Sequence, residues 1–181
     1  MNKLIPTIIS ILLFCHFSFS QAGKKSWQRE LFETADTVML VSHELESKYM
    51  TREEERPGQQ SKNKTKHLEE PLQLMINGRI NYKIVHERLV LKNKQIDRLI
   101  KIMEIPNKYN TVKITPSKCF EPHHTIFLIK KGKISYIDLC FGCNNFETSK
   151  DWEGQVFLIE EMWPKVKRFF LSNGFKYELK S

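Results

Sequence analysis

Residues 119–143 hold the side chains of this sequence that are best suited to chemistry. They include every cysteine beyond the amino-terminal apolar segment and two adjacent histidines: Cys119, His123, His124, Cys140 and Cys143. Thiols and imidazoles bind soft metal ions, and pairs of thiols form or exchange disulfides. The residue types therefore predict a disulfide staple, a metal site or a thiol redox centre.

The first interpretation is a disulfide, and the sequence favours it. Cys119 is expected to pair with Cys143 or with Cys140, which leaves one thiol unpaired. Disulfides persist in exported proteins, where the surroundings are oxidising. Closing a ring of about 25 residues contributes about 3 kcal/mol in the chain-entropy model. In this interpretation the cluster stabilises the domain and needs no cofactor.

The second interpretation is a metal site. Cys140 and Cys143 have the two-residue spacing that lets both thiolates reach one ion. Cys119 and His124, with His123 as a substitute ligand, would complete a tetrahedral Cys3His shell for zinc. Because four protein ligands leave no open position, such a zinc ion would be structural rather than catalytic.

The third interpretation is thiol redox chemistry. A C-x-x-C pair in redox proteins normally stands at the start of a helix, where the helix dipole lowers the thiol pKa. Here the pair follows a predicted strand, which disfavours this interpretation. Because no nucleotide-binding or hydrolase motif occurs elsewhere, the sequence favours a non-enzymatic binding or structural domain.

The amino terminus predicts export. Lys3 is the only charge ahead of an almost wholly apolar run, and serines stand one and three positions ahead of a cut between Ser20 and Gln21. The uninterrupted apolar core is too short to cross about 30 Å of hydrocarbon. We therefore expect residues 1–20 to be a signal peptide and residues 21–181 to form one domain, periplasmic or secreted, without a transmembrane span.

The charge pattern excludes one class of partner. The formal net charge is +8, but the basic residues are dispersed among acidic ones and lack the aromatic interleaving of single-strand binders. We expect no nucleic-acid partner. A partner in the cell envelope or outside the cell is consistent with export.

The hydrophobic patterns predict an α+β fold, a small antiparallel sheet with helices packed on one face. Expected helices cover 26–33, 94–104 with Asn93 as cap, and a segment from Pro164 to a stop at Asn173. Expected strands cover 37–42, one or two segments of 79–91, 125–129 and 134–139. Residues 156–159 form a strand or lead into the last helix. The highly charged segment 44–70 is expected to be a disordered loop.

One predicted hairpin positions the cysteines. A two-residue turn at 131–132 places His123 opposite Cys140 and His124 opposite Leu139, whereas a three-residue turn would shift the pairing by one residue. In both cases the open end of the hairpin gathers the cysteines and at least one histidine.

Residues 119–126 and 139–143 resemble the pattern C-[FY]-x-P-R-H-x-I … [IV]-C-F-x-C of an uncharacterised family of small bacterial exported proteins. The resemblance extends loosely over residues 36–174. His124 matches the family histidine, whereas His123 stands where the family has arginine. The resemblance implies the fold and the Cys/His cluster, and it brings no assigned reaction.

Overall fold

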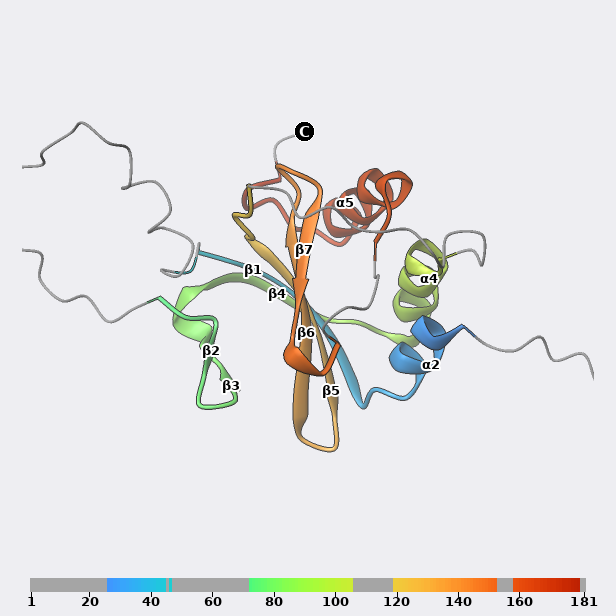
Figure 1. Ribbon diagram of the computed structural model, residues 1–181, viewed down its shortest axis with the longest axis horizontal. Helices are drawn as coiled ribbons and strands as arrows, with labels where there is room; N and C mark the ends of the chain where they lie inside the picture. Colours follow the sequence, from blue (N-terminus) through green and yellow to red (C-terminus); the bar gives the residue numbers. More distant parts are fainter. Residues whose placement is uncertain (1–25, 45, 47–71, 106–118, 153–157, 180–181) are drawn as a thin grey trace, which may run out of the picture.

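The computed structural model describes residues 26–44, 46, 72–105, 119–152 and 158–179. At its centre is a five-stranded antiparallel sheet in the order β4-β1-β5-β6-β7 (Figure 1). Its strands are β1 (Thr37–His43), β4 (Val85–Val90), β5 (His124–Lys130), β6 (Lys133–Cys140) and β7 (Asn145–Thr148). The predicted α+β class is confirmed.

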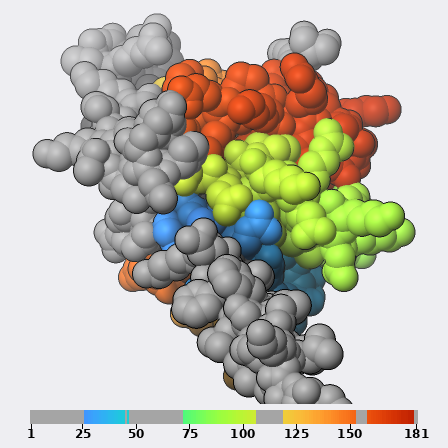
Figure 2. Space-filling model, turned by 90° about the vertical axis from the view of Figure 1, so that its right-hand side faces the viewer, coloured from blue at the N-terminus to red at the C-terminus, as the bar shows by residue number. Residues whose placement is uncertain are grey.

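The helices of the described ranges cover one face of this sheet. They are α2 (Trp27–Glu33), α4 (Asn93–Met103) and α5 (Trp163–Ser172), which appear blue, yellow-green and red in Figure 2. The larger apolar core lies between helices and sheet and includes Leu40, Ile126 and Ile137 from strands and Leu99 and Phe170 from helices. No helix in these ranges is long and apolar enough to cross a membrane.

A small hairpin covers part of the opposite face (Figure 1). It consists of β2 (Met75–Ile76) and β3 (Arg79–Ile80), and the 3₁₀ turn η2 (Tyr82–Ile84) connects it to β4. Together with the sheet it buries a second apolar cluster: Met39, Val41, Leu74, Ile84 and Phe127. The sequence patterns predicted helices on one face of the sheet. They did not predict that the β2–β3 hairpin packs on the other face.

The central hairpin has the predicted register. Lys131 and Gly132 both have positive φ values, 51° and 77°, as a two-residue turn of the hairpin type requires. Lys130 pairs with Lys133, and His124 consequently pairs with Leu139. Because side chains alternate along a strand, this register decides which face each chemically active residue occupies.

One boundary differs from the expectation, and one alternative that the sequence left open is decided. Helix α4 begins at Asn93 and its N-cap is Lys92, because the Gln95 side chain accepts a hydrogen bond from the Lys92 amide at 2.8 Å and closes the first turn. Within the predicted segment 156–159, Leu158 and Ile159 are not a strand. They precede the 3₁₀ turn η5 (Glu160–Met162), which leads into α5.

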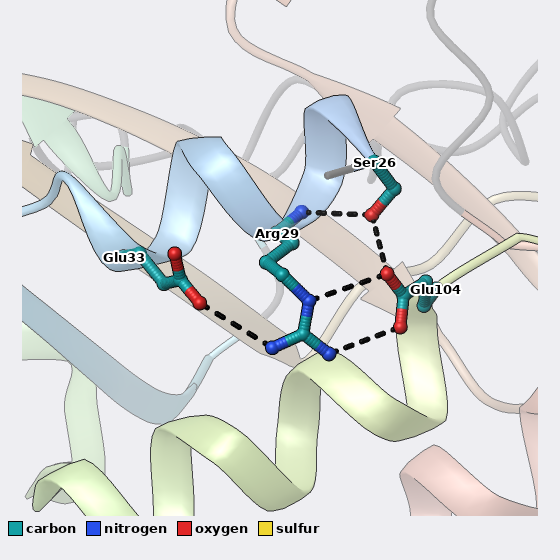
Figure 3. A network of polar contacts seen from close by, with 4 residues as sticks. All are labelled: Ser26, Arg29, Glu33 and Glu104. Atoms are coloured by element: carbon teal, nitrogen blue, oxygen red, sulfur yellow. Dashed lines mark hydrogen bonds and ion pairs between the residues drawn. The ribbon is translucent and has the colours of Figure 1, made fainter. Parts of the chain in front are cut away.

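A polar network joins α2 to the end of α4 (Figure 3). Ser26 caps α2 by accepting from the Arg29 amide and donates from its hydroxyl to Glu104 at 2.7 Å. The Arg29 guanidinium donates to both Glu104 carboxylate oxygens, at 3.1 and 3.3 Å, and also to Glu33. The hydrogen bond from Arg29 is the largest cause that lowers the pKa of Glu104.

The predicted signal peptide, residues 1–20, lies outside the described residues. The predicted loop 44–70 also does, except for Glu44 and Glu46. Glu46 is 5% exposed, and its carboxylate accepts a hydrogen bond from the Leu74 amide at 2.6 Å. The start of the predicted loop therefore packs against the domain.

Candidate functional site

One end of the sheet collects the residues of interest. There β1 and β6 finish, and β4, β5 and β7 begin. Every histidine and cysteine in the described ranges lies at or beside this end: His43, His86, Cys119, His123, His124, Cys140 and Cys143. The predicted gathering at the open end of the hairpin is confirmed for the three cysteines.

The three thiols converge on one point. The Sγ atoms of Cys119, Cys140 and Cys143 all lie within 4.8 Å of one another. The Sγ atoms of Cys140 and Cys143 are 2.9 Å apart, and the Cys143 thiol donates to the carbonyl oxygen of Cys119 at 2.9 Å. Three sulphurs gathered this closely could become ligands of one soft ion after small movements.

A turn and a loop segment create this convergence. Cys140 ends β6 and pairs with Asn145 at the start of β7, so the intervening four-residue turn folds Cys143 back beside Cys140. Asn144 supports the turn with a positive φ of 50°, a conformation that asparagine tolerates better than most residues. Phe120 is 5% exposed and packs against Cys140, which holds the preceding cysteine near the turn.

Burial keeps these thiols protonated as long as no cation is bound. Cys140 is buried, Cys143 is half-buried and Cys119 is exposed. Burial, followed by the hydrogen bonds that Cys143 forms with Cys119 and Cys140, raises the pKa of the Cys143 thiol well above its usual range. Three neighbouring thiolates would repel one another without a cation, and a metal ion removes that repulsion by displacing the protons.

The structure does not bring His124, the histidine of the predicted metal site, to the three thiols. His124 belongs to β5 and pairs with Leu139, so both side chains lie on the helix-covered face, whereas Cys140 lies on the other face. The His124 ring packs edge-on against Phe141 and Phe170, and its Nε2–H donates to the carbonyl oxygen of Tyr177 at 3.0 Å. His124 is therefore a core residue rather than a fourth ligand.

His123, the substitute ligand, is also outside the three-sulphur group. Its Nδ1–H lies 3.2 Å from the carbonyl oxygen of His43, and its ring contacts Tyr177 edge-on. The adjacent backbone explains this placement, because the His43 amide donates to the His123 carbonyl at 2.9 Å. Backbone pairing with the end of β1 thus directs this histidine toward β1.

In the described residues no disulfide joins Cys119 to Cys143 or Cys140, the two pairs that the sequence predicted. A disulfide bond has an S–S length of about 2.05 Å, shorter than the 2.9 Å between Cys140 and Cys143. The Cys143 thiol instead donates to the backbone carbonyl oxygen of Cys119, so Cys143 meets Cys119 through a hydrogen bond and not through a covalent bond.

Sequence reasoning missed a buried polar network on the second face of the sheet. The Thr125 hydroxyl donates to Asp138 at 2.7 Å, and His43 Nε2 lies 3.0 Å from the same hydroxyl. All three side chains are at most 2% exposed. The register that opposes His124 to Leu139 also opposes Thr125 to Asp138. Two polar residues opposite each other on otherwise apolar strands could have indicated this buried network.

The other ring nitrogen of His43 is also hydrogen-bonded. His43 Nδ1 lies 2.7 Å from the carbonyl oxygen of Glu44, which only accepts, so the proton of this hydrogen bond is on Nδ1.

A small cavity adjoins this network. Its volume is about 180 Å³, and its lining consists of Glu46, Gln73, Leu74, Met75, Tyr136 and Asp138. Two carboxylates, one aromatic ring and two apolar side chains thus share a recess between β6 and the segment before β2. The cavity lies on the same face as Cys140, since Asp138 and Cys140 are two positions apart on β6.

The carboxyl-terminal segment packs across the same end of the sheet. The Tyr177 ring stacks on His86 at 3.9 Å, and its hydroxyl donates to Glu44 at 3.3 Å. Burial and the Glu44 carboxylate raise the pKa of Tyr177 to about 12. Glu87 accepts hydrogen bonds from the Lys176 and Tyr177 amides. These bonds anchor the carboxyl-terminal segment, whose Tyr177 carbonyl oxygen accepts the hydrogen bond from His124.

Comparisons with models of known protein families, with curated proteins and with solved structures found no match to this chain.

Proposed function

We propose that this protein is an exported α+β domain that binds a soft divalent metal ion, zinc, through Cys119, Cys140 and Cys143. The observation that carries the proposal is the convergence of these three Sγ atoms within 4.8 Å of one another. Two sulphurs that each lie about 2.3 Å from a zinc ion are at most about 4.6 Å apart. The three thiols therefore need only small movements to reach one ion.

The elements that supply the ligands support a structural role for the ion. Cys140 and Cys143 come from the β6–β7 hairpin, whereas Cys119 comes from the segment ahead of β5. An ion bound by all three would connect the hairpin to that segment. Bound zinc would also keep the thiols reduced in the oxidising compartment that the amino-terminal sequence predicts.

The proposed role is non-catalytic. The proposed partner of the domain is a component of the cell envelope or of the extracellular medium. Zinc binding accounts for all three cysteines, whereas a disulfide accounts for two. It also requires no histidine, in agreement with the separate positions of His123 and His124.

The metal content of the mature chain tests this proposal. The chain is purified under reducing conditions, and zinc and free thiols are counted in the same sample. We expect about one zinc ion per chain and three thiols that become reactive only after a chelator is added. Cys119→Ser, Cys140→Ser and Cys143→Ser should each lower zinc affinity at least tenfold.

His124→Gln is the matched control. This variant keeps the three thiols and should bind zinc with wild-type stoichiometry, measured per folded chain. A reduced wild-type chain with three reactive thiols and no zinc would overturn the proposal. If folded His124→Gln loses zinc, His124 is a ligand, and the Cys3His site is the correct interpretation.

A further inference from the structure

We propose that Cys140 and Cys143 also form a two-electron redox couple whose oxidation to a disulfide ejects the bound ion. This inference rests on the proposed function, since it adds a second activity to the same site. It assigns different tasks to the cysteines: Cys140 and Cys143 change oxidation state, and Cys119 remains a thiol.

The distance between the two sulphurs supports this pairing. They are 2.9 Å apart, and a disulfide requires about 2.05 Å, so an approach of about 0.9 Å closes the bond. Cys140 ends β6, and Cys143 lies in the four-residue turn that follows it. The approach is therefore local and leaves the register of the sheet unchanged.

The position of Cys119 supports its separate task. It comes from another part of the chain, is exposed to solvent, and touches the pair through its carbonyl oxygen, which accepts from the Cys143 thiol. A bridge from Cys119 would have to close between segments 24 positions apart in the sequence. A bridge within the hairpin closes a much shorter loop, whose entropic cost is lower.

The consequence for the ion follows from the ligand count. Once Cys140 and Cys143 are joined, their sulphurs are no longer thiolates and bind zinc poorly. Cys119 alone then remains as a thiolate ligand from the described cluster. One thiolate does not hold a zinc ion that three held, so oxidation and release are coupled.

The reaction balances with a hydroperoxide as the oxidant. The two zinc-bound thiolates lose two electrons and form one S–S bond. Hydrogen peroxide accepts those electrons, its O–O bond breaks, and with two protons from solvent it becomes two molecules of water. The zinc ion leaves the site, and a dithiol reductant reverses the step by thiol–disulfide exchange.

The experiment uses the mature full chain loaded with zinc and titrated with hydrogen peroxide. Released zinc is measured with a chromogenic chelator, and disulfides are located by peptide mass mapping. We expect about one zinc ion released per Cys140–Cys143 bridge, one remaining thiol at Cys119, and renewed zinc binding after reduction. Mapping of the main bridge to Cys119, or a Cys140–Cys143 bridge with zinc retained, would overturn the inference.

Cys119→Ser tests the task assigned to Cys119, although it weakens zinc binding. Because it keeps both thiols of the pair, peptide mapping of its oxidised, metal-free form should still find the Cys140–Cys143 bridge. A bridge that fails to form in this variant would show that Cys119 takes part in the oxidation and would overturn the inference. Absence of zinc from the reduced wild-type chain would overturn the proposed function, whereas zinc binding without oxidative release would overturn only this inference.

Discussion

Neighbouring residues at the start of β5 have different tasks because successive side chains of a strand point to opposite faces. His124 enters the helix-covered core, and Thr125 enters the polar network with His43 and Asp138. At the scale of single residues, the alternation of side chains along the strands thus decides which residues meet. The cysteines belong to the face that carries Asp138.

Burial makes His124 sensitive to acid. Desolvation is the largest cause that lowers its pKa from 6.5 to about 3, so the folded protein holds this imidazole neutral. Below pH 6.5 the unfolded chain binds a proton that the folded chain does not, and stability falls as the pH drops from 6.5 toward 3. At about 1.4 kcal/mol per pKa unit, the loss is on the order of 5 kcal/mol.

Chemical denaturation of wild type and His124→Gln at several pH values checks this. The variant lacks the titrating group, so its stability should depend less steeply on pH in that interval. Parallel curves for the two proteins would contradict the assignment of His124 as a buried neutral residue.

Thr125 connects two buried ionisable groups, and its replacement should be costly. Thr125→Val keeps the shape but removes the hydroxyl between His43 and Asp138, which leaves both without this hydrogen bond. We expect a loss of about 2 kcal/mol or more in the free energy of unfolding. Thr37→Val, at a half-buried position of β1, is the control and should change stability by less than about 0.5 kcal/mol.

At the scale of elements, two turns determine where the cysteines meet. The turn at Lys131 and Gly132 sets the β5–β6 register, and the turn after Cys140 returns Cys143 to its neighbour. Gly132 has a φ of 77°, whereas an added Cβ at Gly142 would lie 3.9 Å from the Cys140 Sγ, an ordinary contact distance.

These two glycines form a matched pair for mutagenesis. Gly132→Ala should cost about 1 kcal/mol because a Cβ strains the left-handed backbone. Gly142→Ala should cost less and keep zinc binding. Equal costs, measured by urea denaturation, would show that backbone strain at Gly132 is not what fixes the hairpin.

The parts predicted from the sequence were those governed by local patterns. The turn residues 131–132 and the alternating apolar residues of β5 and β6 predicted the register of that hairpin. The apolar stripe of α4 predicted that helix. The insertion of β1 between β4 and β5, and the strand β7 after the cysteines, were not predicted. Strand order depends on contacts distant in sequence, and β7 (Asn145–Thr148) is short and lacks a strong apolar alternation.

The candidate site was predicted in part for the same reason. The spacing of Cys140 and Cys143 and their meeting with Cys119 followed from the hairpin. His124 was assigned to the ligand set because it is near in sequence, although the predicted register already opposed it to Leu139. Opposed residues share a face, so that register separated His124 from Cys140.

At the scale of the whole molecule, both faces of the sheet are covered and the chemical groups are left at one end. Helices α2, α4 and α5 bury one face, and the β2–β3 hairpin covers part of the other. The carboxyl-terminal segment closes over the histidines. The cysteine group stays partly exposed, so an ion and an oxidant can reach it from solvent.

The predicted export concerns the whole chain, and processing tests this prediction. The sequence predicts that signal peptidase cuts between Ser20 and Gln21. Protein recovered from its native host should therefore begin at Gln21, as measured by amino-terminal sequencing or intact mass. A chain that retains Met1 would contradict this.

The central claim is that three cysteine thiolates, without a histidine, bind one zinc ion. X-ray absorption at the zinc edge of the zinc-loaded mature chain tests it most directly, because it reports which atoms surround the ion. The account predicts three sulphur neighbours at about 2.3 Å and no imidazole scattering. An imidazole ligand, or a shell with fewer than three sulphurs, would contradict it.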